Sequence, residues 1–218
     1  MMNNPNLVVV VGAGPGVGAA VAKAFAQKGH LLLLVARSAS KLEEIATDLR
    51  GSGAVVTIAA ADAAVPGAVA EVINKIEVPI SALVYNAAAF GGSLLTTDPE
   101  HIRAANEVNL LSLVSATKAA LPKLKAGSGM VLVTGGGFAL HPSSDYGVLS
   151  VGKAMNRTAS ILLAQELKPE GVRVATVIIA GIVAPGTPFD PALIAQTYIE
   201  IFENVESPIE TVFKGVTA

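Results

Sequence analysis

The sequence predicts an α/β fold in which helices cover both faces of one doubly wound parallel sheet. Short runs rich in Val, Leu and Ile alternate along the chain with longer stretches of helical spacing. In addition, 52% of the residues are hydrophobic and only 15% are charged. A sheet buried on both faces needs continuous apolar strands and this much apolar material. The length of 218 residues fits one core, so we expect a single domain over residues 1–218.

The expected elements follow from this alternation. The runs predicted to form buried strands are Leu7–Val11, Leu31–Ala36, Ala54–Ala60, Ser81–Tyr85, Met130–Thr134 and Val172–Ile179. The stretches predicted to form helices are Val17–Lys28, Lys41–Leu49, Gly67–Ile76, Pro99–Lys125 and Ser144–Leu167.

Capping residues support these boundaries. Asp98 precedes Pro99, which places an N-cap before a proline in the first helical position. Gly29, Gly51 and Gly171 lie just past expected helix ends, where a left-handed residue is needed.

Composition excludes several classes of function. A net charge of −2, without any Lys/Arg cluster, gives no footprint for nucleic acid. The absence of cysteine rules out disulfides and thiolate metal sites. Met1–Asn6 carries no basic residue and the run Leu7–Val11 is too short for a signal or a membrane span, so we expect a cytoplasmic protein. The apolar excess also favours a homo-oligomer, because an isolated monomer must keep its surface polar.

A glycine-rich turn connects the first expected strand to the first expected helix. It reads Gly12-Ala13-Gly14-Pro15-Gly16-Val17-Gly18. A turn of this kind gathers backbone N–H groups and the positive end of a helix dipole, and glycines let a pyrophosphate approach the backbone closely. We therefore expect a Rossmann-like sheet with a dinucleotide at Gly12, Gly14, Gly16, Val17 and Gly18. The alternative is a tight turn that serves packing alone.

The end of the second expected strand indicates which dinucleotide is bound. Arg37 follows Ala36, and no Asp or Glu stands where a carboxylate would grip the ribose hydroxyls of NAD. An arginine suits a 2′-phosphate, so NADP(H) is favoured over NAD(H). The alternative is a solvated arginine at a strand end.

The spacing Gly12-x-x-x-Gly16-x-Gly18 resembles the short-chain dehydrogenase/reductase family, and the resemblance extends over nearly the whole chain. The segments Thr134–Gly137 and Ala184–Asp190 look like those of a divergent bacterial subgroup of these enzymes. The resemblance implies a Rossmann fold, a nicotinamide cofactor and assembly into a dimer or tetramer.

Other family landmarks occur in the right order. Asp62, after the third expected strand, resembles the acid that contacts adenine. Asn86 and Ala87, after the fourth, lie in a segment similar to the family's Asn-Asn-Ala-Gly. Asn109 matches the helix asparagine that holds a proton-relay water. Separately, each could be an ordinary turn or helix residue.

The catalytic part of the family pattern is incomplete. The family uses a Tyr four residues before a Lys, and a Ser thirteen residues before that Tyr. The Tyr transfers the carbonyl proton, the Lys lowers the pKa of the Tyr and holds the ribose, and the Ser bonds the substrate oxygen. Lys153 matches this lysine, but Leu149 stands at the Tyr position and Gly136 at the Ser position.

Tyr146 is the candidate replacement for the missing tyrosine. It lies seven residues before Lys153, on nearly the same helical face but one turn further away. It could equally pack at the rim of the pocket. His141, Ser143, Ser144 and Asp145 lie in the same loop.

Two functions remain open from the sequence. The first is an NADP(H)-dependent oxidoreductase for a small carbonyl, alcohol or activated double bond, with Lys153, Tyr146 and Asn109 as catalytic residues. The second is a catalytically silent dinucleotide-binding protein that acts as a sensor or an assembly partner. The losses at Leu149 and Gly136 favour the second function, whereas the retained Lys153, Asn109 and Asn86 favour the first.

Overall fold

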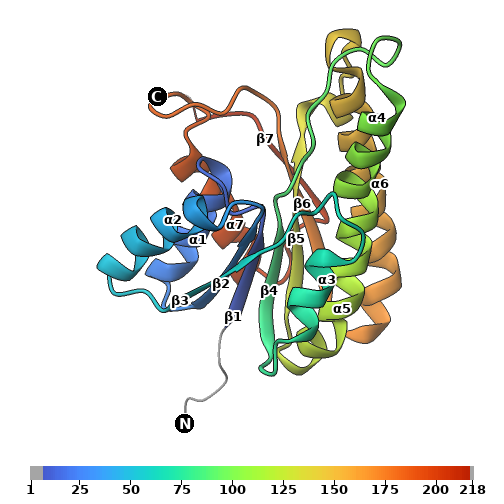
Figure 1. Cartoon of the computed structure of the whole chain (residues 1–218). Coiled ribbons are helices and arrows are strands. Elements are labelled where there is room, and N and C mark those ends of the chain that lie inside the picture. The colour runs from blue at the N-terminus through green and yellow to red at the C-terminus, as the bar shows by residue number, and fades with distance from the viewer. Residues whose placement is uncertain (1–6, 217–218) are drawn as a thin grey trace.

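A seven-stranded, wholly parallel sheet forms the centre of the computed structural model, which describes residues 7–216 (Figure 1). The strand order is β3-β2-β1-β4-β5-β6-β7. The strands are β1 (Leu7–Val11), β2 (Leu31–Ala36), β3 (Val56–Ala60), β4 (Ile80–Tyr85), β5 (Met130–Gly136), β6 (Arg173–Ile179) and β7 (Glu210–Phe213). The predicted fold class is confirmed.

Helices cover both faces of this sheet, as a doubly wound fold requires. On one face lie α1 (Val17–Gln27), α2 (Ala39–Gly51) and α7 (Pro191–Glu203) (Figure 1). On the other lie α3 (Ala68–Asn74), α4 (Pro99–Asn106), α5 (Ser112–Ala126) and α6 (Gly147–Leu167) (Figure 1). Each face has its own apolar core, with Phe25 and Tyr198 buried in the first and Leu113 and Leu124 in the second.

The central strands are continuous apolar runs because both of their faces are buried. Every residue of β1 is buried, and β1 pairs with β2 on one side and β4 on the other. Chain order reverses between these two neighbours, and the carboxyl ends of strands at such a switch point form a crevice. The glycine-rich turn begins at the carboxyl end of β1, directly at this crevice.

Local capping signals define most helix ends. The Asp98 carboxylate accepts from Glu100 N at 2.8 Å, which confirms the expected N-cap of α4. Gly29 and Gly171 have left-handed φ angles of +82° and +72°, as expected. The expectation for Gly51 was wrong, because Gly51 is the last residue of α2 and the left-handed residue is Gly53, at φ +88°.

The C-terminal part of the fold was missing from the expected elements. Strand β7 extends the sheet by one strand beyond β6, and helix α7 precedes it in the chain. Asp190 caps α7 by accepting from Ala192 N at 2.8 Å, and Pro191 occupies its first turn. This Asp-Pro signal is the same as the one at Asp98, so the sequence could have predicted the helix.

The long helix expected over Pro99–Lys125 is interrupted. A widened turn, η1 (Glu107–Leu111), separates α4 from α5, and Ser112 N–H donates to the Glu107 carbonyl five residues earlier. The expected helix Ser144–Leu167 likewise begins as the short 3₁₀ turn η3 (Ser144–Tyr146) before α6. Two further 3₁₀ turns are η2 (Gly137–Ala139) and η4 (Lys168–Glu170).

Within residues 7–216, no helix has both the length and the apolar character needed to cross a membrane. Met1–Asn6, which contributed to the expectation of a cytoplasmic protein, lies outside this described range.

Candidate functional site

The outer glycines of the turn are fixed by close backbone contacts. Gly12 has a φ of +83°, and a Cβ there would lie 2.4 Å from Ala87 N. A Cβ on Gly18 would lie 2.4 Å from the Gly12 carbonyl oxygen. Any side chain at either position would therefore push apart the turn, the first turn of α1 and the end of β4.

The inner glycines face open space. A Cβ on Gly14 or Gly16 would have no neighbour within 4 Å, and Gly16 has a φ of +103° that strains other residues. Ala19 and Ala20 donate to the carbonyls of Gly14 and Gly16, both at 3.0 Å. The first N–H groups of a helix have no acceptor inside it, so those of Val17 and Gly18, at the start of α1, are available to an anion. This turn, which we call the cradle, has the glycines, the open space and the helix N-terminus of a phosphate-binding turn.

Asn86 ties the end of β4 to this cradle. Its Nδ2 donates to the Gly12 carbonyl at 2.8 Å, and its backbone N–H donates to the Val11 carbonyl at 2.8 Å. Ala87, the next residue, provides the backbone against which Gly12 packs. The structure therefore brings Asn86 and Ala87 together with the glycine turn.

Arg37 and Asp62 lie at the carboxyl ends of the neighbouring strands β2 and β3. The Arg37 side chain is exposed, and no ion pair or hydrogen bond involving it is formed within residues 7–216. Asp62 is partly buried, and its Oδ1 accepts from Ala64 N at 2.9 Å. The cradle, Arg37 and Asp62 thus follow the carboxyl ends of β1, β2 and β3, which are adjacent strands of the sheet.

Lys153 is a buried cation on α6. Its Nζ donates to the Thr134 carbonyl of β5 at 2.9 Å. Burial lowers the pKa of Lys153 from 10.5 to about 8, because desolvation penalises the ammonium form. Leu149, one helical turn earlier, is also buried and adds apolar surface rather than a hydroxyl.

Gly136 provides the space through which the Lys153 side chain passes. A Cβ at Gly136 would lie 3.3 Å from both Cγ and Cε of Lys153. A serine at this position would require a shift of the lysine by a few tenths of an ångström.

Tyr146 lies at the surface in front of α6. Its side chain is 52% exposed and stacks on Phe138, with ring centroids 5.1 Å apart and an interplanar angle of 25°. The adjoining loop is held by Ser150, whose Oγ accepts from Ser143 N at 3.1 Å. His141, Ser144 and Asp145 of this loop are exposed.

Asn109 is fully buried in the widened turn η1. Its Oδ1 accepts from Ala89 N at 3.4 Å, and its backbone carbonyl accepts from the Nδ2 of Asn156 on α6. A Cβ on Gly152 would lie 2.4 Å from Asn109 Nδ2, so only glycine permits this approach. The structure thus joins Asn109 to the helix that carries Lys153.

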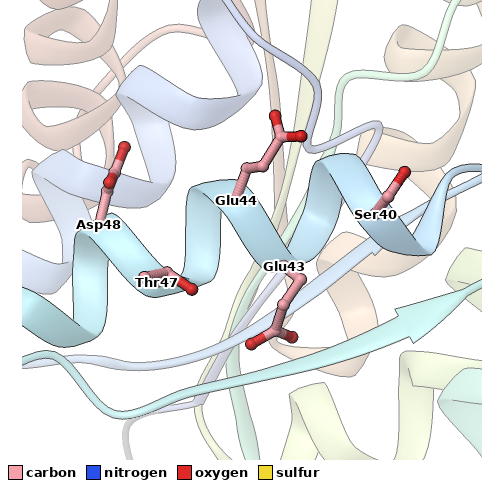
Figure 2. Close-up of a pocket in the computed structure, with 5 residues that line it drawn as sticks. All are labelled: Ser40, Glu43, Glu44, Thr47 and Asp48. Atoms are coloured by element: carbon pink, nitrogen blue, oxygen red, sulfur yellow. The ribbon is translucent and has the colours of Figure 1, made fainter.

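A hollow elsewhere on the surface is lined by only one helix, whereas several elements meet at the site described above. The residues that line this hollow all belong to α2: Ser40, Glu43, Glu44, Thr47 and Asp48. Figure 2 shows that the Glu43 and Glu44 side chains point to opposite sides of this helix. Carboxylates would also repel the phosphates of a dinucleotide, and we assign no site there.

The sequence profile of the family described as short chain dehydrogenase matches residues 6–192. This chain belongs to the short-chain dehydrogenase family. The match covers β1 through the first residues of α7, and it therefore includes every site residue described above.

Curated short-chain dehydrogenase relatives differ in how much of their length this chain covers. An uncharacterised oxidoreductase of Mycobacterium tuberculosis is 30% identical over 192 residues, which cover 86% of this chain and 71% of the relative. A very-long-chain 3-oxoacyl-CoA reductase of Podospora anserina is 31% identical over 198 residues, which cover 82% of this chain and only 58% of that enzyme.

Solved structures superpose over almost the whole chain. An alcohol dehydrogenase of the archaeon Thermococcus sibiricus, solved with 5-hydroxy-NADP, is 26% identical with a TM-score of 0.87 and covers 97% of each chain. A metagenomic short-chain oxidoreductase, solved with NADP, is 24% identical with a TM-score of 0.88 and covers 99% of each chain.

Several buried polar residues of this short-chain dehydrogenase site were not expected from the sequence. Thr134 provides the acceptor for Lys153 and pairs its own hydroxyl with that of Tyr198, and Asn156 bonds the Asn109 carbonyl. Asn156 could have been found, because it lies three residues after Lys153 and hence on the same helical face. The Tyr198 contact crosses the sheet, and no local pattern predicts it.

Proposed function

We propose that this chain is an NADP(H)-dependent oxidoreductase for a small carbonyl, an alcohol or an activated double bond, and that residues 1–218 act as one dinucleotide-binding domain. The observation that carries this proposal is the open cradle at Gly14 and Gly16 in front of α1, at the switch point of the sheet. The NADP-type ligands of the Thermococcus and metagenomic structures agree with it.

The binding residues would divide the cofactor among the strand ends. The pyrophosphate would rest on the turn, Arg37 would pair with the 2′-phosphate, and Asp62 would contact the adenine. Lys153 would hold the ribose near the reacting ring. The turn and the end of β4 contribute Gly12, Gly14, Gly16, Val17, Gly18, Asn86 and Ala87.

The bound nicotinamide would supply the hydride, and the chain would position it and provide the proton. Leu149 and Gly136 cannot transfer a proton, so this chain would lack the usual catalytic Tyr and Ser of its family, as the divergent bacterial subgroup does. Tyr146, or a water molecule near it, would be the proton donor. Asn109 would act beside Lys153 through the contact of η1 with α6.

A second function has its own supporting observation. Leu149 is buried where a hydroxyl would be needed, and the Tyr146 ring stacks on Phe138. A catalytically silent NADP(H)-binding protein, acting as a sensor or an assembly partner, would show the same features.

The experiment that separates the two functions measures NADPH consumption across a panel of aldehydes, ketones and activated alkenes. We expect turnover by the wild type and a loss of at least tenfold for Tyr146→Phe, because general acids contribute about 10²–10⁴-fold. Phe138→Leu is the matched control, since it removes the stacking partner but no hydroxyl. Binding of NADPH without consumption by any substrate would instead support the silent protein.

A further inference from the structure

Thr134 lies where strand β5 loses one of its two neighbours. The ladder between β4 and β5 ends at the pair Tyr85–Val133, whereas the ladder between β5 and β6 continues to Gly136–Ile179. The carbonyl of Thr134, one residue past the shorter ladder, accepts from Lys153 Nζ at 2.9 Å. This neutral oxygen is the only hydrogen-bond acceptor of the Lys153 ammonium within residues 7–216.

The side chain of the same threonine reaches the opposite face of the sheet. Its Oγ1 lies 2.6 Å from the hydroxyl oxygen of Tyr198, which belongs to α7. Tyr198 has 0% exposure and packs in the core shared by α1, α2 and α7. Lys153 approaches from α6 on the other face, so Thr134 connects the two helical layers through one residue (Figure 1).

Burial preserves the hydrogen bond between Tyr198 and Thr134 as the pH changes, because it keeps the Tyr198 phenol neutral. Desolvation raises the pKa of Tyr198 well above its ordinary value, so the phenol stays neutral and remains a hydrogen-bonding hydroxyl. If the phenol hydroxyl were removed, the Thr134 hydroxyl would be left without a partner in the core. An unpaired buried hydroxyl costs free energy, so we expect the Thr134 side chain to turn toward another partner and its peptide to lose the position that the Tyr198 contact fixes.

In the described part of the chain, no charged group competes with the Thr134 carbonyl for the Lys153 ammonium. Desolvation alone accounts for the lowered pKa of the lysine. The charged and titratable side chains of α6 itself and of the elements packed against it are Glu100, His101, Arg103, Glu107, Asp145, Tyr146, Arg157, Glu166, Lys168, Glu170 and Arg173. None of them forms an ion pair or a hydrogen bond with Lys153 within residues 7–216.

We propose that Tyr198 is a positioning residue, which fixes the Thr134 peptide and thereby the Lys153 ammonium. The consequence for function rests on the proposed role of Lys153 in holding the cofactor. A buried ammonium stabilised by one neutral carbonyl depends on the position of that carbonyl. When Tyr198 loses its hydroxyl, the charged form of Lys153 therefore becomes less stable.

Tyr198→Phe tests this proposal, and Tyr85→Phe is its matched control. Tyr85 is 1% exposed, and its hydroxyl donates to the Val108 carbonyl at 2.6 Å on the other face of the sheet. Both substitutions delete one buried hydroxyl with a hydrogen bond of the same length, and both should lower thermal stability. Tyr198 bonds the residue whose carbonyl accepts from Lys153, whereas Tyr85 bonds Val108, which makes no hydrogen bond with Lys153 within residues 7–216.

The main measurement is the titration midpoint of Lys153, followed by NMR of protein labelled with ¹³C-lysine and assigned with Lys153→Arg. We expect Tyr198→Phe to lower the midpoint by about half a pH unit, which is about threefold in the deprotonation equilibrium. Tyr85→Phe should leave the midpoint unchanged. An unchanged midpoint in Tyr198→Phe, or an equal shift in both variants, overturns the proposal.

Thr134→Val and Thr134→Ser test the same connection if Tyr198→Phe fails to fold. The valine keeps the backbone carbonyl but removes the hydroxyl, so it should lower the midpoint, whereas the serine should preserve it. Equal midpoints in these two variants would count against the proposal.

A second measurement, NADPH affinity as a function of pH, connects the midpoint to function. In Tyr198→Phe, binding should weaken at a lower pH than in the wild type. The NMR titration needs no cofactor. If the wild type fails to bind NADPH, the proposed function fails, while the midpoints still decide whether Tyr198 positions Lys153.

Discussion

At the scale of single residues, Lys153 combines burial, positive charge and one neutral acceptor. Its position on α6 follows from the family pattern, but its environment differs from that pattern. Leu149 puts apolar surface where the family pattern has a phenol, and Gly136, against which the lysine stem packs, puts no hydroxyl there. Both changes make the site less polar, so the ammonium group depends on the Thr134 carbonyl.

This environment predicts how stability changes with pH. The pKa of Lys153 is about 8 in the folded protein and 10.5 in the unfolded chain. Between these values the unfolded chain binds more protons, so wild-type stability should rise with pH by up to about 3 kcal/mol from this group. Below pH 8 both states carry the proton, and the penalty is constant.

Unfolding of Lys153→Met by urea at several pH values measures this contribution. The stability difference between variant and wild type should change by up to about 3 kcal/mol from pH 8 to 10.5 and stay constant below pH 8. Methionine leaves the Thr134 carbonyl without its lysine donor, which changes stability at every pH. The test is therefore how the stability difference changes with pH, and not its value at one pH. Lys118→Met, at an exposed lysine of α5, is the control. A difference independent of pH would contradict the prediction.

Restoring the missing hydroxyls should create or raise carbonyl reductase activity. Leu149→Tyr places a phenol four residues before Lys153, where the ammonium lowers its pKa. Adding Gly136→Ser supplies a donor for the substrate oxygen, at the cost of a small shift of Lys153. We expect the double variant to exceed either single variant in NADPH-dependent ketone reduction. Leu149→Phe controls for ring size, and equal rates for Phe and Tyr would contradict the prediction.

At the scale of elements, the contact between η1 and α6 holds Asn109 beside the lysine helix. Replacing glycine by alanine inside a helix ordinarily stabilises a protein by about 0.5–1 kcal/mol. At Gly152 the added Cβ would lie 2.4 Å from Asn109 Nδ2, so the sign should reverse. We expect Gly152→Ala to destabilise the fold by about 1–3 kcal/mol, as overpacking does.

Gly51→Ala is the matched control for this prediction, because a Cβ at Gly51 in α2 meets nothing within 4 Å. It should raise the free energy of unfolding measured with urea. If both alanine variants are stabilised equally, η1 and α6 do not pack as described.

Elements with strong local signals were predictable. The boundaries of β1 and β2 agree with the predicted runs, because continuous apolar residues end there at glycine or polar residues. The widened turn η1 was not predictable, since no local pattern marks it and the contact of Asn109 with α6 is tertiary. The strand–turn–helix arrangement around the glycines after β1 was predictable from the sequence, whereas Thr134 and Tyr198 meet only because β5 and α7 are neighbours in space.

At the scale of the whole molecule, exposed apolar residues on α6 bear on the expected homo-oligomer. Val151 and Leu162 are 41% and 50% exposed, and their spacing of about three helical turns places them on one face. Leu111 of η1 is also exposed, at 54%. We propose that this face pairs the subunits of the dimer or tetramer that the family resemblance implies.

Light scattering at micromolar concentration tests this assembly. The wild type should have at least twice the mass of one chain, and Leu162→Glu should shift it toward the monomer, because a carboxylate in an apolar interface is costly to bury. Val55→Glu changes an exposed valine before β3 and should leave the mass unchanged. A monomeric wild type would contradict the prediction.

Calorimetric titration of NADPH tests the central claim, that the glycine turn holds the phosphates of NADP(H). A Cβ at Gly14 meets nothing within 4 Å, so we expect Gly14→Asn and Gly14→Asp, which have nearly the same shape and differ in charge, both to fold. We predict that the wild type binds NADPH more tightly than NADH, and that Arg37→Ala reduces this preference. Gly14→Asp should bind NADPH at least tenfold more weakly than Gly14→Asn, because a carboxylate repels a pyrophosphate. No binding of either cofactor by the wild type, or equal affinities of the Asn and Asp variants for NADPH, would contradict the account.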